Sequence, residues 1–121
     1  MSRDDGILLV EDDDDLREAL AVYLESEGYE VLQARNGEEA LAQLRTGGVV
    51  CLIVLDLFMP VMDGWRFRTE QLGDPALAAI PVLVLSADAA APAKGAKLGA
   101  VASLVKPVDF DRLMQHVEHH C

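Results

Sequence analysis

The sequence predicts an α/β fold, in which a five-stranded parallel sheet is covered by helices on both faces. Apolar runs of strand length alternate along the chain with segments whose apolar residues recur at helical spacing. The strand-length runs are almost continuously apolar, as in residues 51–55, and this indicates strands buried on both faces. At 121 residues the chain has the size of one domain, so we expect a single domain over residues 1–121. The five expected strands are residues 7–10, 29–34, 51–55, 81–85 and 102–105.

The first two expected helices carry clear boundary signals. After the acidic run that begins at Glu11, apolar residues recur at i, i+4, i+7 and i+8, starting from Leu16. Gly28 ends this helix. Asn36, followed three residues later by Glu39, has the spacing of a capping box and opens the second helix.

The later helices are less uniform. Asp63 and Gly64 mark the loop that leads into the third helix, and Asp109 is a good cap for the last one. Residues 88–100 are rich in Ala, Gly and Lys and have little apolar periodicity. We expect only a short or mobile helix there.

Composition excludes several classes of function. The formal net charge of −11 argues against direct binding to nucleic acid. The longest apolar stretch, residues 49–55, is far shorter than a membrane helix, and no signal-peptide pattern is present. Cys51 lies inside an apolar run and Cys121 is the last residue, so we expect two unpaired cysteines in a reducing, cytoplasmic setting.

Charged and polar residues follow the expected strands at the points where the strands end. Because the carboxyl ends of parallel strands meet at one edge of the sheet, these side chains are expected to gather there. Several acids beside one lysine cost free energy unless a cation and an anionic ligand complete the site. The pattern therefore predicts a divalent metal and a phosphoryl group, with Asp56 as the acceptor. The residues at the strand ends are Glu11, Asp12, Asp56, Ser86 and Lys106.

Four motifs in order resemble the receiver domain of two-component response regulators, over nearly the whole chain. They are residues 9–12 (LVED), residues 56–64 (DLFMPVMDG), residues 81–87 (PVLVLSA) and residues 106–107 (KP). The resemblance implies a flavodoxin-like three-layer α/β/α sandwich with strand order 2-1-3-4-5.

The resemblance also implies a metal site for Mg²⁺, with Mn²⁺ as a substitute. Asp12 and Asp56 would each give a carboxylate oxygen, the backbone carbonyl of Phe58 a third ligand, and Glu11 would hold a coordinated water. An EF-hand calcium loop is rejected, because the sixth position from Glu11 is Leu16 where that loop needs glycine.

By the same resemblance, Asp56 is the nucleophile that takes the phosphoryl group. The Lys106 ammonium, the Ser86 hydroxyl and the Ala87 backbone N–H would neutralise the transferred oxygens. A cis peptide bond is expected before Pro107.

The sequence departs from the family pattern at one position. Receiver domains commonly carry Tyr or Phe three residues before the lysine, and here that residue is Ser103. Output is then expected to run through backbone shifts after Ser86 or through ordering of residues 88–100, and the sequence does not choose between them. Phe58 and Asp88 occupy positions that influence the lifetime of the acyl phosphate in this family.

These patterns predict a signalling module that catalyses only its own phosphorylation and dephosphorylation. The expected partners are a histidine kinase or phosphotransfer protein and a downstream protein that reads the surface near residues 88–120. We expect a monomer or weak dimer, and Met1 with the short tails favours a stand-alone regulator over a piece of a larger protein.

Two other functions fit less well. A phosphohydrolase of the haloacid-dehalogenase type needs an acid where Phe58 stands, and a flavodoxin-like cofactor binder needs a Ser/Thr-rich phosphate loop after the first strand.

Overall fold

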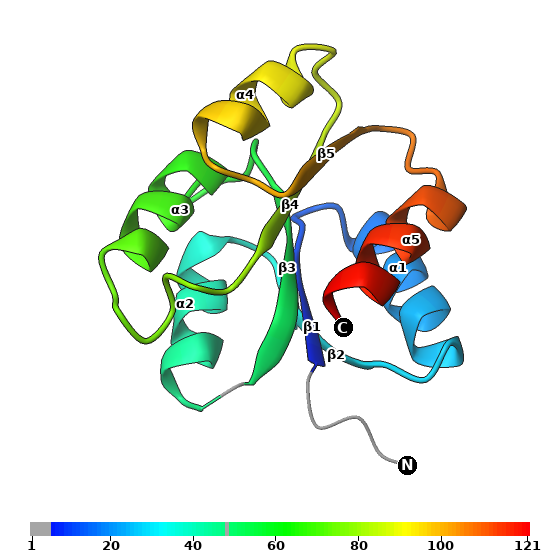
Figure 1. Cartoon of the computed structure of the whole chain (residues 1–121), viewed down its shortest axis with the longest axis horizontal. Coiled ribbons are helices and arrows are strands. Elements are labelled where there is room, and N and C mark those ends of the chain that lie inside the picture. Colours follow the sequence, from blue (N-terminus) through cyan, green and yellow to red (C-terminus); the bar gives the residue numbers. More distant parts are fainter. Residues whose placement is uncertain (1–5, 48) are drawn as a thin grey trace.

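The computed structural model describes residues 6–47 and 49–121, and it forms a three-layer sandwich around one parallel sheet (Figure 1). The strand order is β2-β1-β3-β4-β5, and every neighbouring pair is parallel. The predicted flavodoxin-like order is therefore confirmed. The strands are β1 (Gly6–Val10), β2 (Glu30–Ala34), β3 (Val50–Asp56), β4 (Val82–Ser86) and β5 (Ala102–Val105), and the helices are α1 (Asp14–Ser26), α2 (Gly37–Arg45), α3 (Gly64–Leu72), α4 (Ala91–Lys97) and α5 (Phe110–His120).

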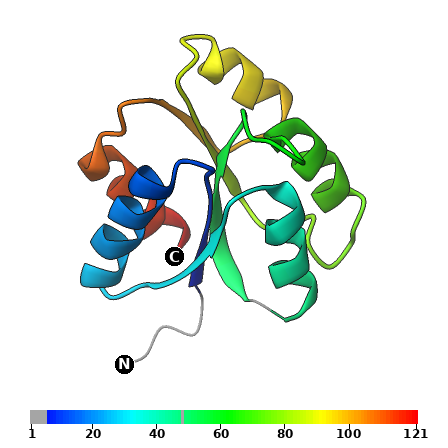
Figure 2. The ribbon, with the colours of Figure 1, turned by 180° about the vertical axis from the view of Figure 1, so that it is seen from behind.

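The two faces of the sheet carry separate apolar cores, because successive side chains of a strand point to opposite faces. In β1, Ile7 and Leu9 pack in one core with α1 and α5, whereas Leu8 and Val10 pack in the other with α2 and α3. Both views show α1 and α5 on one face and α2, α3 and α4 on the other (Figures 1 and 2). Phe67 of α3 is fully buried in the second core.

Helix caps follow the sequence signals. The Asp13, Asp63 and Asp109 carboxylates accept hydrogen bonds from the first-turn amides of α1, α3 and α5. At α2, Asn36 Oδ1 accepts from the Glu39 N–H, while the Glu39 carboxylate accepts from the N–H of Arg35, one residue before the cap. The expected capping box is thus present with its return bond displaced by one residue.

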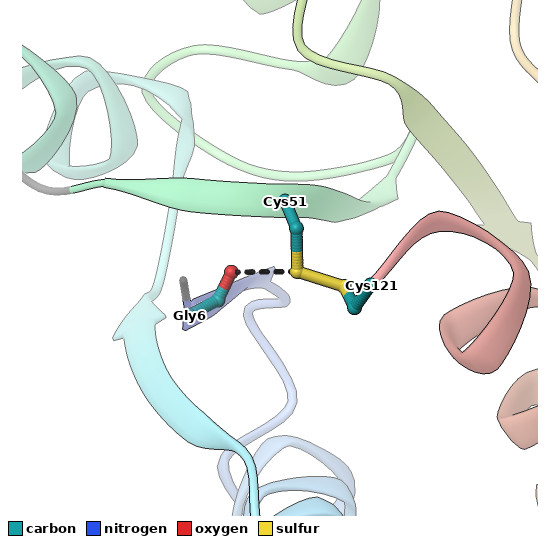
Figure 3. The surroundings of a disulfide bond; sticks show 3 residues. All are labelled: Gly6, Cys51 and Cys121. Carbon is teal, nitrogen blue, oxygen red and sulfur yellow. Dashed lines mark hydrogen bonds between the residues drawn. A yellow bond between two sulfur atoms is a disulfide. The ribbon is translucent and has the colours of Figure 1, made fainter. Parts of the chain in front are cut away.

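The expectation of two unpaired cysteines is wrong, because Cys51 and Cys121 form a disulfide (Figure 3). The register of β1 against β3 passes from Gly6↔Val50 to Ile7↔Leu52, so Cys51 is an extra residue in an irregularity of β3. Its Sγ also lies 3.4 Å from the Gly6 carbonyl oxygen. Since α5 runs back across the sheet, its end meets the start of β3, and the Cα atoms of the two cysteines are 5.4 Å apart. The inference of a reducing setting from these cysteines loses its basis.

Among the described residues, no helix combines the length and apolar character needed to cross a bilayer. The expected domain boundary at residue 1 falls within residues 1–5, which lie outside the described part of the chain. The region expected to hold a short or mobile helix contains α4, which has seven residues.

Candidate functional site

The five polar residues expected at the strand ends all lie at the carboxyl edge of the sheet. Asp56 and Ser86 are the last residues of β3 and β4, the acids of the first loop directly follow β1, and Lys106 directly follows β5. The strands concerned are β1, β3, β4 and β5, and β3 is the central strand of the sheet. The topology therefore brings residues from four separate parts of the chain to one place.

Three acids form a compact cluster at this edge. One carboxylate oxygen each from Glu11, Asp12 and Asp56 lies within 4.8 Å of the others. Glu11 and Asp56 are buried and Asp12 is exposed, so the cluster opens to solvent on the side of Asp12. A small cation could reach it from that side.

The Lys106 ammonium forms ion pairs with two of these acids. It contacts Glu11, and its Nζ lies 3.4 Å from Asp56 Oδ2. Burial by itself lowers the pKa of Lys106, but the Glu11 and Asp56 carboxylates outweigh it and raise the pKa above its ordinary value. Lys106 therefore stays charged beside the Asp56 carboxylate.

The acids are electrostatically strained despite this lysine. Burial, followed by the neighbouring Asp56, raises the pKa of Glu11 above its usual value. Burial and the adjacent Glu11 likewise raise the pKa of Asp12. Three carboxylates facing one ammonium leave excess negative charge at the edge.

This donor set fits a small hard cation. All available ligands are oxygens, which Mg²⁺ prefers. Among the described residues, Glu11 Oε1 is the one buried side-chain oxygen without a hydrogen bond, although Lys106 faces it as an ion-pair partner. A buried acceptor in that condition gains free energy from a further positive partner or a bound water.

Ser86 and the residues after it line the other side of the edge. Ser86 is fully buried, and its Oγ accepts a hydrogen bond of 3.1 Å from the Asp88 N–H. That bond leaves the hydroxyl proton for another acceptor. Ala87 is exposed, immediately beyond the strand end.

The loop after Asp56 is built on a close backbone approach. A Cβ at Gly64 would lie 2.8 Å from the Asp56 carbonyl oxygen, so only glycine fits there without movement. The Gly64 N–H donates to the Leu57 carbonyl, and the Phe58 N–H donates to Asp56 Oδ1 at 3.2 Å. These contacts hold Asp56 and the Phe58 backbone together. The Lys106–Pro107 peptide bond is cis.

One side chain near the site, that of Lys94, escaped the sequence analysis. Lys94 of α4 forms an ion pair with Asp88 and lies over the rings of Phe58 and Trp65. Nothing in the Ala- and Gly-rich composition of residues 88–100 singles out Lys94. The spacing of six residues from Asp88 places the two side chains together only once the bend before α4 is known.

A comparison with known families decides what this arrangement belongs to. The family model described as the response regulator receiver domain matches residues 7–118, which contain every site residue above. The chain belongs to the response regulator receiver domain family. Receiver domains are the phosphorylated modules of two-component systems, so the expected family and function are confirmed at that level.

Curated relatives of this receiver domain are longer proteins. The chain is 37% identical over 115 residues to the transcriptional regulatory protein GlrR of Escherichia coli, and the match covers 93% of this chain and 25% of GlrR. It is 36% identical over 101 residues to the transcriptional regulatory protein SrrA of Staphylococcus aureus, covering 84% of this chain and 41% of SrrA. The receiver domain thus spans well under half the length of these relatives.

Solved receiver structures agree in fold over the whole chain. A response regulator receiver protein from Pseudomonas putida superposes with a TM-score of 0.88 at 30% identity, covering 98% of this chain and 99% of that one. The response regulator TrrA of Thermotoga maritima, solved in complex with Mg²⁺ and beryllium fluoride, superposes with a TM-score of 0.84 at 31% identity, covering 97% and 99%.

Proposed function

We propose that Asp56 is the phosphoacceptor of this receiver domain and that it takes its phosphoryl group from a histidine kinase or a phosphotransfer protein. An Asp56 carboxylate oxygen forms a bond to phosphorus as the bond from phosphorus to the donor histidine nitrogen breaks, and the electron pair remains on that nitrogen. The observation that carries this proposal is the cluster of Glu11, Asp12 and Asp56 beside the Lys106 ammonium.

The chain's own groups are placed to hold the transferred oxygens. Lys106 Nζ already lies 3.4 Å from Asp56 Oδ2, so its charge can follow an oxygen bonded to that carboxylate. The Ser86 hydroxyl, at the end of the neighbouring strand, and the Ala87 N–H supply neutral donors. Such groups accelerate transfer because the charge they stabilise is spread over the three oxygens in the transition state.

We assign the metal to Asp12, Asp56 and the Phe58 carbonyl, with Glu11 holding a coordinated water. Mg²⁺ bound there would neutralise negative charge on the acceptor and on the incoming phosphoryl group. The complex of TrrA with Mg²⁺ and beryllium fluoride supports this choice, and Mn²⁺ has the same preference for oxygen ligands. Phe58, two residues after Asp56, and Asp88, two residues after Ser86, would modulate hydrolysis of the acyl phosphate.

The expected partners of the domain are proteins. The surface near residues 88–120 has two conformations, and phosphorylation shifts the equilibrium between them. A downstream protein binds one of the two conformations better. The charge of −11 supports a protein target over direct contact with nucleic acid. We place the domain, 1–121, in the cytoplasm as a monomer or weak dimer that acts as a signalling module and not as an enzyme on other substrates.

The test is phosphorylation of purified protein by acetyl phosphate with Mg²⁺. Wild type should gain one acid-labile phosphoryl group by mass spectrometry, and Asp56→Asn should gain none. Asp63→Asn is the matched control, because Asp63 lies in the same loop and asparagine still caps α3. Undiminished acid-labile phosphorylation of Asp56→Asn would contradict the assignment.

A further inference from the structure

Helix α4 is attached to the site by one carboxylate. Its cap residue, Ala90, makes no side-chain cap bond, and its N–H donates instead to Asp88 Oδ1 at 2.8 Å. The other Asp88 oxygen forms an ion pair with Lys94, one turn into the helix. Asp88 therefore holds both the first amide before α4 and a side chain from its middle.

The Lys94 ammonium also rests on two aromatic rings from the opposite side of the site. It lies 5.2 Å from the centroid of the Phe58 ring and 5.8 Å from that of Trp65. The two rings pack edge to face, with centroids 5.2 Å apart. Cations are attracted to ring faces at such distances. Lys94 thus joins α4 to the loop after β3 and to α3.

Both ends of this cluster touch the proposed phosphoacceptor machinery. Asp88 donates its N–H to Ser86 Oγ at 3.1 Å, and Phe58 donates its N–H to Asp56 Oδ1 at 3.2 Å. If the Ser86 hydroxyl turns toward a phosphoryl group on Asp56, the bond from the Asp88 N–H to Ser86 Oγ is lost or rearranged. The Asp88 backbone, whose side chain is held by the Ala90 N–H and Lys94, then loses its hydrogen bond to the end of β4.

A rotating aromatic ring at position 103 cannot carry the signal, because that residue is Ser103 and α4 packs against it. A Cβ placed on Gly95 would lie 2.0 Å from Ser103 Oγ, so the α4 backbone rests directly on Ser103. No larger side chain fits between them while α4 stays in place. Any rearrangement that needs more room beside Ser103 therefore requires α4 to move.

We propose that Lys94 is a positioning residue that couples the state of the Ser86 hydroxyl to the position of α4. At rest, Asp88 holds Lys94 against Phe58 and Trp65 and keeps α4 seated on β5. Phosphorylation of Asp56 releases Lys94, and α4 moves away from Ser103. The proposal rests on the proposed function, because it needs Ser86 to respond to a phosphoryl group on Asp56.

The experiment uses Mg²⁺ and beryllium fluoride as the probe of the phosphorylated state. Trp65 is the only tryptophan in the chain, so its fluorescence reports whether Lys94 leaves its ring. Hydrogen exchange of the Lys94 and Leu98 amides, which donate to the Ala90 and Lys94 carbonyls, reports on α4. In wild type we expect the probe to change Trp65 emission and to raise exchange of these amides about tenfold.

The variants separate coupling from simple structural support. Lys94→Met keeps the apolar stem, and Asp88→Asn keeps the side-chain shape. Each should show Trp65 emission and α4 exchange near the activated values without the probe, and little further change with it. The double variant should match either single one, because the two residues act through one contact. Lys97→Met, at the exposed end of the same helix, should behave as wild type.

The outcomes distinguish this inference from the function it rests on. Bound beryllium fluoride is detected by ¹⁹F NMR, and Asp56 phosphorylation by mass spectrometry. If wild type binds the probe and Lys94→Met still responds as wild type does, the coupling role is overturned. A wild type that binds the probe with no change at α4 overturns it as well. If wild type neither binds the probe nor accepts phosphate, the proposed function fails first.

Discussion

Cys121, the last residue of the chain, is joined by a disulfide to Cys51, 70 residues earlier at the start of β3. The bond holds the end of α5 against the edge of the sheet opposite the acidic cluster (Figure 3). It closes a long loop that includes three strands and three helices. It therefore restricts the unfolded chain far from the site.

Reduction of this disulfide is expected to destabilise the fold without altering the acidic cluster. In the chain-entropy model, a loop of this length contributes about 4 kcal/mol to the free energy of unfolding. Urea unfolding of wild type with and without dithiothreitol measures the loss. Mg²⁺ affinity under the two conditions should agree.

Cys121→Ser is the matched control, because Cys121 is exposed and the change removes one sulfur only. Its unfolding should resemble that of the reduced wild type and should not respond to dithiothreitol. Two thiols titrating in native, unreduced wild type would contradict the pairing.

Loss of one acid should weaken the proposed metal site. Asp12→Asn removes one charged ligand oxygen from the cluster and is expected to lower Mg²⁺ affinity about tenfold, or ~1.4 kcal/mol. Isothermal titration calorimetry measures this. Asp15→Asn, an exposed acid in the same run, should bind Mg²⁺ like wild type. Equal losses in both variants would mean that general negative charge, and not a ligand set, attracts the ion.

The Arg35–Glu39 pair at the start of α2 predicts a pH dependence. The Arg35 N–H, followed by its guanidinium, lowers the pKa of Glu39 below its ordinary 4.5. A carboxylate with a lowered pKa stabilises the fold above pH 4.5. This stability is lost as the pH falls through the pKa that the group has in the folded state. The Arg35 side chain is exposed and that of Glu39 is partly exposed, so solvent screening leaves a contribution on the order of 0.5 kcal/mol.

Glu39→Gln isolates this contribution, because glutamine can still accept from the Arg35 N–H. The difference in unfolding free energy between wild type and variant should shrink as pH falls from about 6 to about 3. Glu38→Gln, on the exposed side of the same turn, serves as the control. A difference that grows toward low pH would reverse the expected sign.

Val61 is strained in the loop that follows Asp56. Its φ is 69°, and the Met62 N–H donates to the Pro60 carbonyl at 2.8 Å, so Val61 is the centre of a γ-turn. Such strain costs about 1–3 kcal/mol in a β-branched residue. Val61→Gly is therefore expected to raise the free energy of unfolding by about 1 kcal/mol after glycine's larger chain entropy is counted. Thermal unfolding measures it, and Val61→Ala should gain less.

The site could be predicted largely from sequence because its residues lie at strand ends. Apolar runs that stop at Asp56, Ser86 or Lys106 mark both the strand and the edge where it ends. In a parallel sheet these ends meet, so a local pattern predicts a distant encounter. The same reasoning fails for Lys94, because its contacts with Phe58 and Asp88 depend on how a seven-residue helix is seated.

Sequence by itself determined the α/β class, the caps at Asn36 and Asp109, and which polar residues share the carboxyl edge. These features follow from spacing along the chain, which sets side-chain direction and hydrogen bonding within a few residues. Tertiary structure alone decided the Cys51–Cys121 disulfide and the packing of Gly95 against Ser103. It also decided the contacts of Lys94 with Asp88, Phe58 and Trp65. Each of these depends on how far one packed element shifts against another, and no local periodicity encodes that distance.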